Sequence, residues 1–271
     1  MSIYLKFDLS KLCLKVIEIT REVGSFISSE LGKVEDHHIV EKDLHSLVSY
    51  VDIESEKKLV VDLRKLIPDS GFITEENTTE ISTNAEFTWI IDPLDGTTNY
   101  LRGIPIFCIS IALLHQDKLV LGVIYHIMQD ELFHTWKGGG AYLNGRPISV
   151  SNIQTIQEAV VATGFPYKVK KMAELTGILQ VILNESRGVR RLGSAAIDLA
   201  YTACGRFDCY YEAAINPWDV AAGILLIEEA GGIVSDMDGS ENPLFAKNIL
   251  ASNKNVYAEF LQLIQSAKNK I

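Results

Sequence analysis

Apolar residues near the N-terminus recur at the three- to four-residue spacing of an amphipathic helix. One helical face is formed by Leu12, Val16, Ile19, Val23 and Ile27. A second helix is predicted from about Glu54 to Ile67, and it should end at Pro68 to Gly71 because proline and glycine interrupt helical geometry. The N-terminal part therefore predicts a helical layer.

The pattern then changes to short apolar strands separated by turns. The predicted strands are Phe72-Ile73, Phe87 to Ile91, Ile104 to Leu114, Lys118 to Ile127 and Glu131 to Trp136. Gly138-Gly139-Gly140 and Asn144-Gly145 are predicted turns, since the glycine cluster is not followed by the helix that a phosphate-binding loop needs. This region predicts an antiparallel meander.

Strands and helices alternate in the second half of the chain. The strands are predicted at Ala159 to Ala162, Val189 to Leu192, Phe207 to Glu212 and Gly232 to Ser235, and the helices at Lys168 to Leu183, Ser194 to Cys204 and Trp218 to Ala230. This alternation predicts an α/β unit. We therefore expect an N-terminal α+β domain, residues 1–145, and a C-terminal α/β domain, residues 146–271, with a cleft between them.

Composition narrows the class of protein. The net charge of -10, without a Lys/Arg-rich block, makes nucleic-acid binding unlikely, because such binding depends on basic side chains that neutralise phosphates. The four cysteines form no C-x-x-C pair, which favours reduced thiols. Charged residues interrupt the N-terminal stretch, and no uncharged apolar run reaches the roughly 18 residues of a membrane span. We expect a cytoplasmic protein that does not enter a membrane.

Candidate chemistry is concentrated between Trp89 and Asn99. An apolar strand runs into Asp92 and Asp95, and Pro93 stiffens the turn between the two carboxylates. Their oxygens, with the Leu94 carbonyl, are hard ligands that select Mg²⁺ over soft metals. If Gly96 opens a short helix, the first N–H groups of that helix could face a phosphate.

Three further acidic positions are candidates, each with an alternative. Glu75-Glu76 follows a short strand, so Glu75 can face a site while Glu76 supports it, although such a pair is often a surface feature. Asp219 lies in the first turn of an apolar helix, where the helix dipole favours a carboxylate with or without a function. Asp52 has the same simple explanation as a helix-capping residue.

Other phosphatase chemistries find little support in the sequence. Ser235-Asp236-Met237-Asp238-Gly239-Ser240 resembles the aspartyl-nucleophile motif of haloacid-dehalogenase-type phosphatases, but too few residues follow it to build that fold, and we predict a turn there. No H-E-x-x-H or G-x-S-x-G motif occurs. These observations leave water as the nucleophile.

Taken together, the motifs resemble those of the inositol monophosphatase family. The matching segments are Val51-Asp52, Ile73-Thr74-Glu75-Glu76, Trp89 to Asn99, Gly193-Ser194-Ala195-Ala196, Pro217-Trp218-Asp219 and Glu229-Ala230-Gly231-Gly232. They span nearly the whole chain in the family's order. The resemblance implies an α-β-α-β-α sandwich of the inositol monophosphatase and fructose-1,6-bisphosphatase type, usually assembled as a homodimer and sensitive to lithium.

The same resemblance implies roles for individual residues. Glu75, Asp92, the Leu94 carbonyl, Asp95 and Asp219 correspond to the ligands of a pair of Mg²⁺ ions and of a third, weaker one. Asp52 and Thr97 correspond to the catalytic pair that orients and deprotonates the attacking water, and Glu76 to a supporting residue behind the ligands. The substrate contacts would be Gly96, Thr97, Thr98, Ser194, Ala195 and Glu212.

The implied activity is Mg²⁺-dependent hydrolysis of a myo-inositol monophosphate, or of a similar small polyol or sugar phosphate, by a metal-activated water. Fructose 1,6-bisphosphate, histidinol phosphate and adenosine 3',5'-bisphosphate stay open as substrates, and so does a regulatory role as a partner of the transcription machinery. The chain departs from the family at Thr74, which replaces a glycine, and in Val34 to Leu47, which does not clearly reproduce a lysine-bearing loop; Lys42 is the candidate there.

Overall fold

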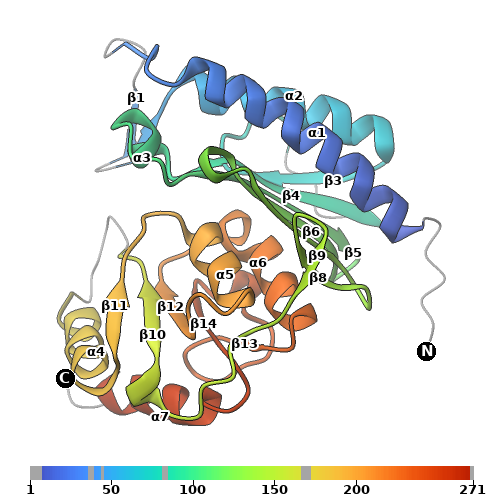
Figure 1. Ribbon diagram of the computed structural model, residues 1–271. Coiled ribbons are helices and arrows are strands. Elements are labelled where there is room, and N and C mark those ends of the chain that lie inside the picture. Colours follow the sequence, from blue (N-terminus) through green and yellow to red (C-terminus); the bar gives the residue numbers. More distant parts are fainter. Residues whose placement is uncertain (1–7, 36–39, 44–45, 81–84, 166–171, 269–271) are drawn as a thin grey trace.

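Two β-sheets form the framework of the molecule (Figure 1), seen in a computed structural model that describes residues 8–35, 40–43, 46–80, 85–165 and 172–268. The larger sheet has seven strands in chain order: β3 (Gly71–Thr74), β4 (Phe87–Asp95), β5 (Cys108–His115), β6 (Lys118–His126), β7 (Glu131–Trp136), β8 (Gly140–Leu143) and β9 (Arg146–Ile148). All its neighbouring strands are antiparallel except β3 and β4.

The smaller sheet mixes parallel and antiparallel pairs. Its order is β11 (Gly188–Arg190), β10 (Val160–Thr163), β12 (Cys209–Ala213), β14 (Asn248–Ser252) and β13 (Ile233–Ser235). The strand β10 is parallel to both of its neighbours, whereas β14 is antiparallel to β12 and β13. A separate hairpin joins β1 (Val40–Asp43) to β2 (Ser46–Val48).

Helices cover and separate the sheets (Figure 1). The helices α1 (Leu9–Glu30) and α2 (Tyr50–Leu66) cover the outer face of the larger sheet, α5 (Ala195–Ala203) and α6 (Pro217–Glu229) lie between the sheets, and α4 (Met172–Glu185) and α7 (Tyr257–Lys268) cover the smaller sheet. Short helices lie at α3 (Thr97–Leu101), Ile127–Gln129, Ile156–Glu158 and Pro243–Phe245. This arrangement confirms the predicted α-β-α-β-α sandwich.

Both faces of the larger sheet are buried, which explains why its strands are continuously apolar. Alternate residues of β5 show the division. Ile109, Ile111 and Leu113 pack in the cluster beneath α1 and α2, whereas Ala112 and Leu114 pack against the central helices. The strands from β3 to β7 therefore contribute to two cores.

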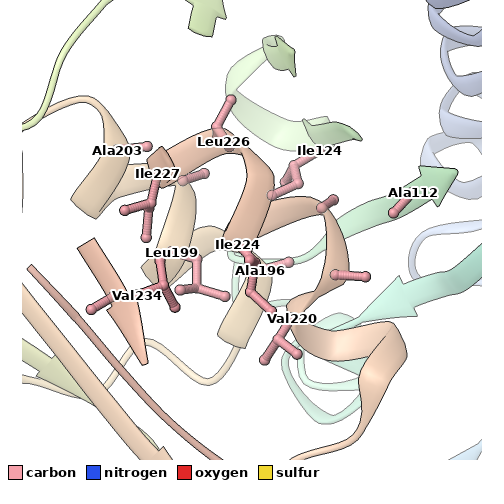
Figure 2. Close-up of a cluster of buried hydrophobic side chains, with 14 of the residues drawn as sticks. Ala112, Ile124, Ala196, Leu199, Ala203, Val220, Ile224, Leu226, Ile227 and Val234 are labelled. Atoms are coloured by element: carbon pink, nitrogen blue, oxygen red, sulfur yellow. The ribbon is translucent and has the colours of Figure 1, made fainter. Parts of the chain in front are cut away.

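The central helices approach their neighbours closely because small residues lie at the contacts. A Cβ atom on Gly122 of β6 would lie 3.0 Å from the Ala222 carbonyl oxygen of α6, and one on Gly223 would lie 2.5 Å from Leu199 of α5. Figure 2 shows Leu199 of α5 with Ile224 and Ile227 of α6 in this buried layer. The helix α6 is apolar on nearly every side, as expected for a helix between two sheets.

Several predicted boundaries were wrong for identifiable reasons. The helix α2 begins at Tyr50, before the predicted Glu54, because Ser49 and Asp52 form a capping box. The strand β4 continues past Ile91 to Asp95, and β5 begins at Cys108 because Ile104 to Phe107 follow a turn in which the Ile104 N–H donates to the Asn99 carbonyl. The prediction missed β1, β2, β8, β9, β14 and α7. The start predicted for α4, at Lys168, lies outside the described residues.

The predicted turns are confirmed. Asn144 and Gly145 have φ values of 49° and 75°, and they join β8 to β9. Asp236 accepts hydrogen bonds from the Asp238 and Ser240 N–H groups, which closes a turn after β13. The proposed domain boundary between residues 145 and 146 falls within the β8–β9 hairpin, and the two-domain division stays a prediction. No helix in the described ranges is long and apolar enough to cross a membrane.

Gly122→Val should destabilise the protein by about 1–3 kcal/mol, since the new side chain must displace the α6 backbone. Gly188→Val is the matched control: it also lies on a strand, but a Cβ there meets only the end of the Arg190 side chain, at 3.4 Å. Denaturant-induced unfolding would measure both variants. Equal stability of the two variants would contradict the close approach of α6 to the sheet.

Candidate active site

A cavity of about 370 Å³ lies between the two halves of the chain. This volume suits a small molecule. Its lining includes the predicted residues Glu75, Asp92, Leu94, Asp95, Gly96, Thr97, Thr98, Ser194, Ala195, Glu212 and Asp219. Residues far apart in the sequence therefore meet at one cavity.

A β-bulge sets the direction of the two aspartates of β4. Asp92 pairs with Ser110 and Asp95 with Cys108, so two residues of β4 lie opposite the single Ile109 of β5. In a regular strand, residues three apart point to opposite faces. The extra residue restores the same face to Asp92 and Asp95, while Leu94 packs beneath α1 and α2.

Glu75 reaches the cavity from the loop that follows β3. This loop is held by the buried Glu56 carboxylate of α2. The carboxylate accepts hydrogen bonds from the Glu76 N–H at 2.7 Å and from the Thr78 N–H at 2.7 Å. Glu76 itself does not line the cavity. Glu56 was missed by the sequence analysis, although a charged residue on the apolar face of a helix is a usable signal.

Asp95 connects the larger sheet to the start of α5. Its Oδ2 atom accepts hydrogen bonds from the Ser194 hydroxyl at 2.7 Å and from the Ala196 N–H at 2.7 Å. Ser194 is also the N-cap of α5. These donors favour the ionised form of Asp95, whereas burial, the larger effect, raises its pKa.

Asp219 is presented by the first turn of α6. Its Oδ2 atom accepts a hydrogen bond from the Asn216 N–H at 2.7 Å, which completes a capping box at the start of the helix. Pro217 stands at the first helical position, where a missing N–H costs nothing. The capping interpretation of Asp219 is thus correct, and the same residue also lines the cavity.

The acidic side chains are unfavourable neighbours of one another. Burial raises the pKa of Asp92 well above its usual range, and the charges of Glu75, Asp95 and Asp219 raise it further. Burial, followed by Asp95 and Glu75, raises the pKa of Asp219 in the same way. Within the described residues, no three His, Cys, Asp or Glu side chains are already gathered in a metal-binding arrangement.

The carboxylate and carbonyl oxygens that line the cavity nevertheless suit hard divalent cations. Carboxylates that repel one another in a buried place are compensated by a bound cation, and carboxylate and carbonyl oxygens are the ligands that Mg²⁺ prefers. The Leu94 carbonyl, which borders the same cavity, accepts a hydrogen bond from the Thr97 hydroxyl at 3.1 Å. The cavity lining therefore offers oxygen donors of the predicted kind.

Asp52 and Thr97 form a pair next to this cluster. The Thr97 hydroxyl lies 2.8 Å from Asp52 Oδ1, and Asp52 Oδ2 accepts the Ser49 N–H at 2.9 Å and the Ser49 hydroxyl at 2.7 Å. Burial raises the pKa of Asp52, although these donors oppose the rise. Asp52 is both a helix-capping residue and the hydrogen-bond partner of a residue that lines the cavity.

The wall contributed by the smaller sheet contains Glu212. Its Oε2 atom accepts the Tyr210 hydroxyl at 2.6 Å, and a Cβ on Gly164 would come within 2.1 Å of its Oε1. Glycine at position 164 is therefore what leaves room for this carboxylate. Burial raises the pKa of Glu212 to about 7.

The sequence analysis also missed polar residues of the C-terminal half. Asp198 and Arg191 line the cavity, and the Cys108 thiol lies 3.5 Å from the Ser194 hydroxyl. Asp198 could have been found from the sequence, because a single charged residue in the otherwise apolar segment Ala195–Ala203 is unusual. The side chain of Lys42 lies outside the described residues.

Comparison with known proteins identifies the family. The sequence profile described as "Inositol monophosphatase family" matches residues 8–269. The chain belongs to the inositol monophosphatase family. An inositol-1-monophosphatase of Mesorhizobium japonicum is 39% identical over 251 residues, which cover 92% of this chain and 94% of the relative. The Nus factor SuhB of Escherichia coli K12 is 38% identical over 246 residues, covering 90% and 92%.

Solved structures of the inositol monophosphatase family have the same fold. The extragenic suppressor protein suhB of Bartonella henselae aligns with a TM-score of 0.90 at 37% identity, covering 94% of this chain and 98% of that one. An IMPase of Thermotoga maritima aligns with a TM-score of 0.87 at 31% identity, covering 96% and 99%. The resemblance found in the sequence and the sandwich it implied are both confirmed.

Asp92→Asn should stabilise the protein in a chelator at mildly alkaline pH. A carboxyl whose pKa is raised in the folded state loses stabilising free energy as the pH rises through that value, and the neutral amide avoids this loss. The variant keeps an acceptor for the Leu94 N–H, which lies 3.0 Å from Asp92 Oδ1. We expect a melting temperature higher by about 3 °C or more.

Mg²⁺ should then raise the melting temperature of the wild type more than that of Asp92→Asn, because bound cations stabilise the folded state. Asp117→Asn, remote from the cavity lining, serves as the control and should respond to Mg²⁺ like the wild type. A chelated Asp92→Asn protein that melts below the wild type would disprove the charge-repulsion argument.

Proposed function

We propose that this protein is a Mg²⁺-dependent phosphomonoesterase that hydrolyses a myo-inositol monophosphate, or a similar small polyol or sugar phosphate, by direct attack of water. The single observation that carries the proposal is the meeting of Glu75, Asp92, Asp95 and Asp219 at one cavity beside the Asp52–Thr97 pair. Family membership supports phosphatase activity.

Glu75, Asp92, the Leu94 carbonyl, Asp95 and Asp219 would hold two to three Mg²⁺ ions. When bound, these ions would neutralise the phosphoryl oxygens, make water more acidic and stabilise the departing alkoxide. The protein prepares the ligands by fixing their backbones. The bulge directs Asp92 and Asp95, Glu56 holds the Glu75 loop, and the capping box holds Asp219.

Thr97 and Asp52 would orient the attacking water and take up its proton. The Thr97 hydroxyl donates to Asp52, which leaves its oxygen lone pairs free to accept a hydrogen bond from water on the cavity side. As the water attacks phosphorus, its proton can pass to the Thr97 oxygen while the hydroxyl proton moves to Asp52. The raised pKa of Asp52 suits it to this role, because a stronger base accepts the proton more readily.

The substrate would lie with its phosphate near the start of α3 and its alcohol part toward the C-terminal half. Gly96, Thr97 and Thr98 line the cavity at the start of α3, where the first N–H groups of a helix have no intrahelical partner. Gly96 adopts φ = 99°, and a Cβ there would lie 2.9 Å from the Ile106 carbonyl oxygen. Ser194, Ala195 and Glu212 would contact the alcohol part, with the Glu212 carboxylate accepting a hydrogen bond from a substrate hydroxyl.

The alternative substrates belong to the same chemical class. Fructose 1,6-bisphosphate, histidinol phosphate and adenosine 3',5'-bisphosphate all place a phosphate ester beside polar groups that the cavity could accept. Phosphate release from a panel of these esters with Mg²⁺ separates them. Negligible release from inositol phosphates beside strong release from another ester would reject the leading substrate.

A regulatory role in the transcription machinery is the second candidate function, because several relatives are named Nus factor SuhB. The net charge of -10 favours a protein partner over direct nucleic-acid binding. Asp95→Asn should abolish hydrolysis while retaining the fold. A cellular phenotype that depends on the protein and survives this substitution would support the regulatory role.

The proposal includes a homodimer whose hydrolysis is inhibited by lithium, as the family resemblance implies, and a cytoplasmic location, as the sequence pattern led us to expect. The four cysteines are all free thiols, and burial raises the pKa of Cys13 to about 12. Unreactive buried thiols are consistent with a reducing compartment. Sedimentation of the purified protein tests the dimer, and LiCl titration of the hydrolysis rate tests the inhibition.

Thr97→Val should lower kcat for myo-inositol 1-phosphate by about 100- to 1,000-fold, because it removes the hydroxyl between water and Asp52. Thr176→Val, on the exposed side of α4, is the matched control and should keep wild-type activity. Phosphate release at saturating Mg²⁺ measures both variants. A Thr97→Val enzyme with wild-type kcat would disprove the role assigned to the hydroxyl.

Glu212 should make substrate binding dependent on pH. With a pKa of about 7, the carboxyl group is protonated below neutrality and is then a weaker acceptor of hydrogen bonds from substrate hydroxyls. The affinity for substrate should therefore fall as the pH decreases. In Glu212→Gln this contribution is absent at every pH. The ratio of KM values, variant over wild type, should therefore rise from pH 6 to pH 8, roughly the range over which such a carboxyl ionises; a constant ratio would contradict the assignment.

A further inference from the structure

Asp198 is a buried residue whose Oδ1 atom accepts no hydrogen bond from the part of the chain that the structure describes. It lies in the first turn of α5, its residue surface is 1% exposed, and it lines the cavity. Among the described residues, no donor contacts its Oδ1 atom, and no basic side chain forms an ion pair with it. Because Asp198 lines the cavity, the cavity is the side from which a bound molecule would supply a donor.

An unpaired buried carboxyl group is costly, and its retention requires an explanation. The start of α5 gives some compensation through the helix dipole, but a dipole does not replace a hydrogen-bond donor. The helix would cap without Asp198, because Ser194 is the N-cap and its hydroxyl oxygen accepts the Ile197 N–H at 3.3 Å. The local structure of α5 therefore does not account for this side chain.

Glu212 is the electrostatic neighbour of Asp198. Burial raises the pKa of Asp198 well above its usual range, and the charges of Glu212 and Asp95 raise it further, against a small opposing effect of Arg191. The Tyr210 hydroxyl donates a hydrogen bond to Glu212 Oε2, and the carboxylate of Glu212 packs against Gly164, where a Cβ atom would lie 2.1 Å from Oε1. Two carboxyl groups therefore lie on one wall of the cavity, and the described residues give Asp198 Oδ1 no donor and give Glu212 the Tyr210 hydroxyl at Oε2.

A molecule with neighbouring hydroxyl groups supplies the missing donors. One hydroxyl can donate to Glu212 and the next to Asp198, and hydroxyls do so without bringing another negative charge into an acidic wall. A substrate lacking these hydroxyls would leave Asp198 without a donor and Glu212 with the Tyr210 hydroxyl alone, which is how a polar site rejects an apolar analogue. The wall is therefore suited to discriminate between alcohols.

We propose, resting on the function proposed above, that Asp198 is a specificity-determining residue that accepts a hydrogen bond from a hydroxyl on the alcohol part of the substrate, next to the hydroxyl accepted by Glu212. The chemical class selected is a phosphate ester of a polyol with adjacent free hydroxyl groups.

The test compares Asp198→Ala with the wild type on two esters that share a six-membered ring. Myo-inositol 1-phosphate carries ring hydroxyls and cyclohexyl phosphate carries none. For the inositol ester we expect kcat/KM to fall by about 10- to 100-fold, the cost of one hydrogen bond to a carboxylate. For cyclohexyl phosphate, kcat/KM should stay the same or rise, and the Ki of inorganic phosphate should not change.

Asp208→Ala is the matched control for a structural effect. Asp208 is also a buried aspartate of the C-terminal half, but its Oδ2 atom accepts the Val160 N–H at 2.7 Å, and it lies outside the cavity lining. It should lower the melting temperature without changing the ratio of kcat/KM values for the two esters. Asp198→Asn, which retains one acceptor oxygen, should recover part of the activity on the inositol ester.

The outcomes separate this inference from the proposed function. Asp198→Ala with equal losses on both esters, or with an altered Ki for phosphate, would overturn the specificity role, and so would unchanged activity on the inositol ester. In each of these cases the wild type still hydrolyses the ester and the proposed function stands. A wild-type protein that releases phosphate from neither ester would reject the proposed function and this inference with it.

Discussion

Several carboxylates are buried together at the junction of the two halves, and the rest of the site is arranged around this unfavourable grouping. Three of the acids accept hydrogen bonds that hold them in place: Asp52 from the Ser49 N–H, Asp95 from the Ser194 hydroxyl and the Ala196 N–H, and Asp219 from the Asn216 N–H. These bonds fix positions but leave much of the charge uncompensated, since burial and mutual repulsion still raise the pKa values of Asp92 and Asp219. A bound cation would compensate this charge, and this is the physical basis for the proposed Mg²⁺ dependence.

The junction depends on a few specific contacts as well as on apolar packing. Asp95 bridges the larger sheet and α5, and the Asn99 side-chain amide donates to the Ile106 carbonyl at 2.8 Å and to the Leu192 carbonyl at 2.9 Å. A Cβ on Gly193 would come within 3.0 Å of Asn99. The segment from Asp92 to Asn99 therefore contributes acids to the site and also contacts the C-terminal half directly. The same residues thus determine both the geometry of the site and the packing of the two halves.

Much of the fold and of the candidate site was predictable from the sequence, because short-range residue patterns indicate it. The acid-rich end of an apolar strand at Asp92 and Asp95, the helical face from Leu12 to Ile27 and the turn at Asn144-Gly145 all have short-range signatures. The bulge was not predictable, because spacing alone would place Asp92 and Asp95 on opposite faces, and only pairing with β5 shows the extra residue. Glu56 and Asp198 escaped notice because a single charged residue in an apolar pattern reveals its purpose only when its spatial neighbours are known.

The outer helix α2 limits how far the chain could be shortened without losing the candidate site. Asp52 and Glu56 lie one turn apart on α2; the first contacts Thr97, and the second holds the backbone of the loop that carries Glu75. A truncated chain that began at β3 would retain both sheets and the central helices. It would lack Asp52, the proposed proton acceptor, and Glu56, which holds the loop of the proposed cation ligand Glu75. An active fragment would therefore need the outer helix α2 as well as the two sheets, because α2 supplies contacts to both Thr97 and the Glu75 loop.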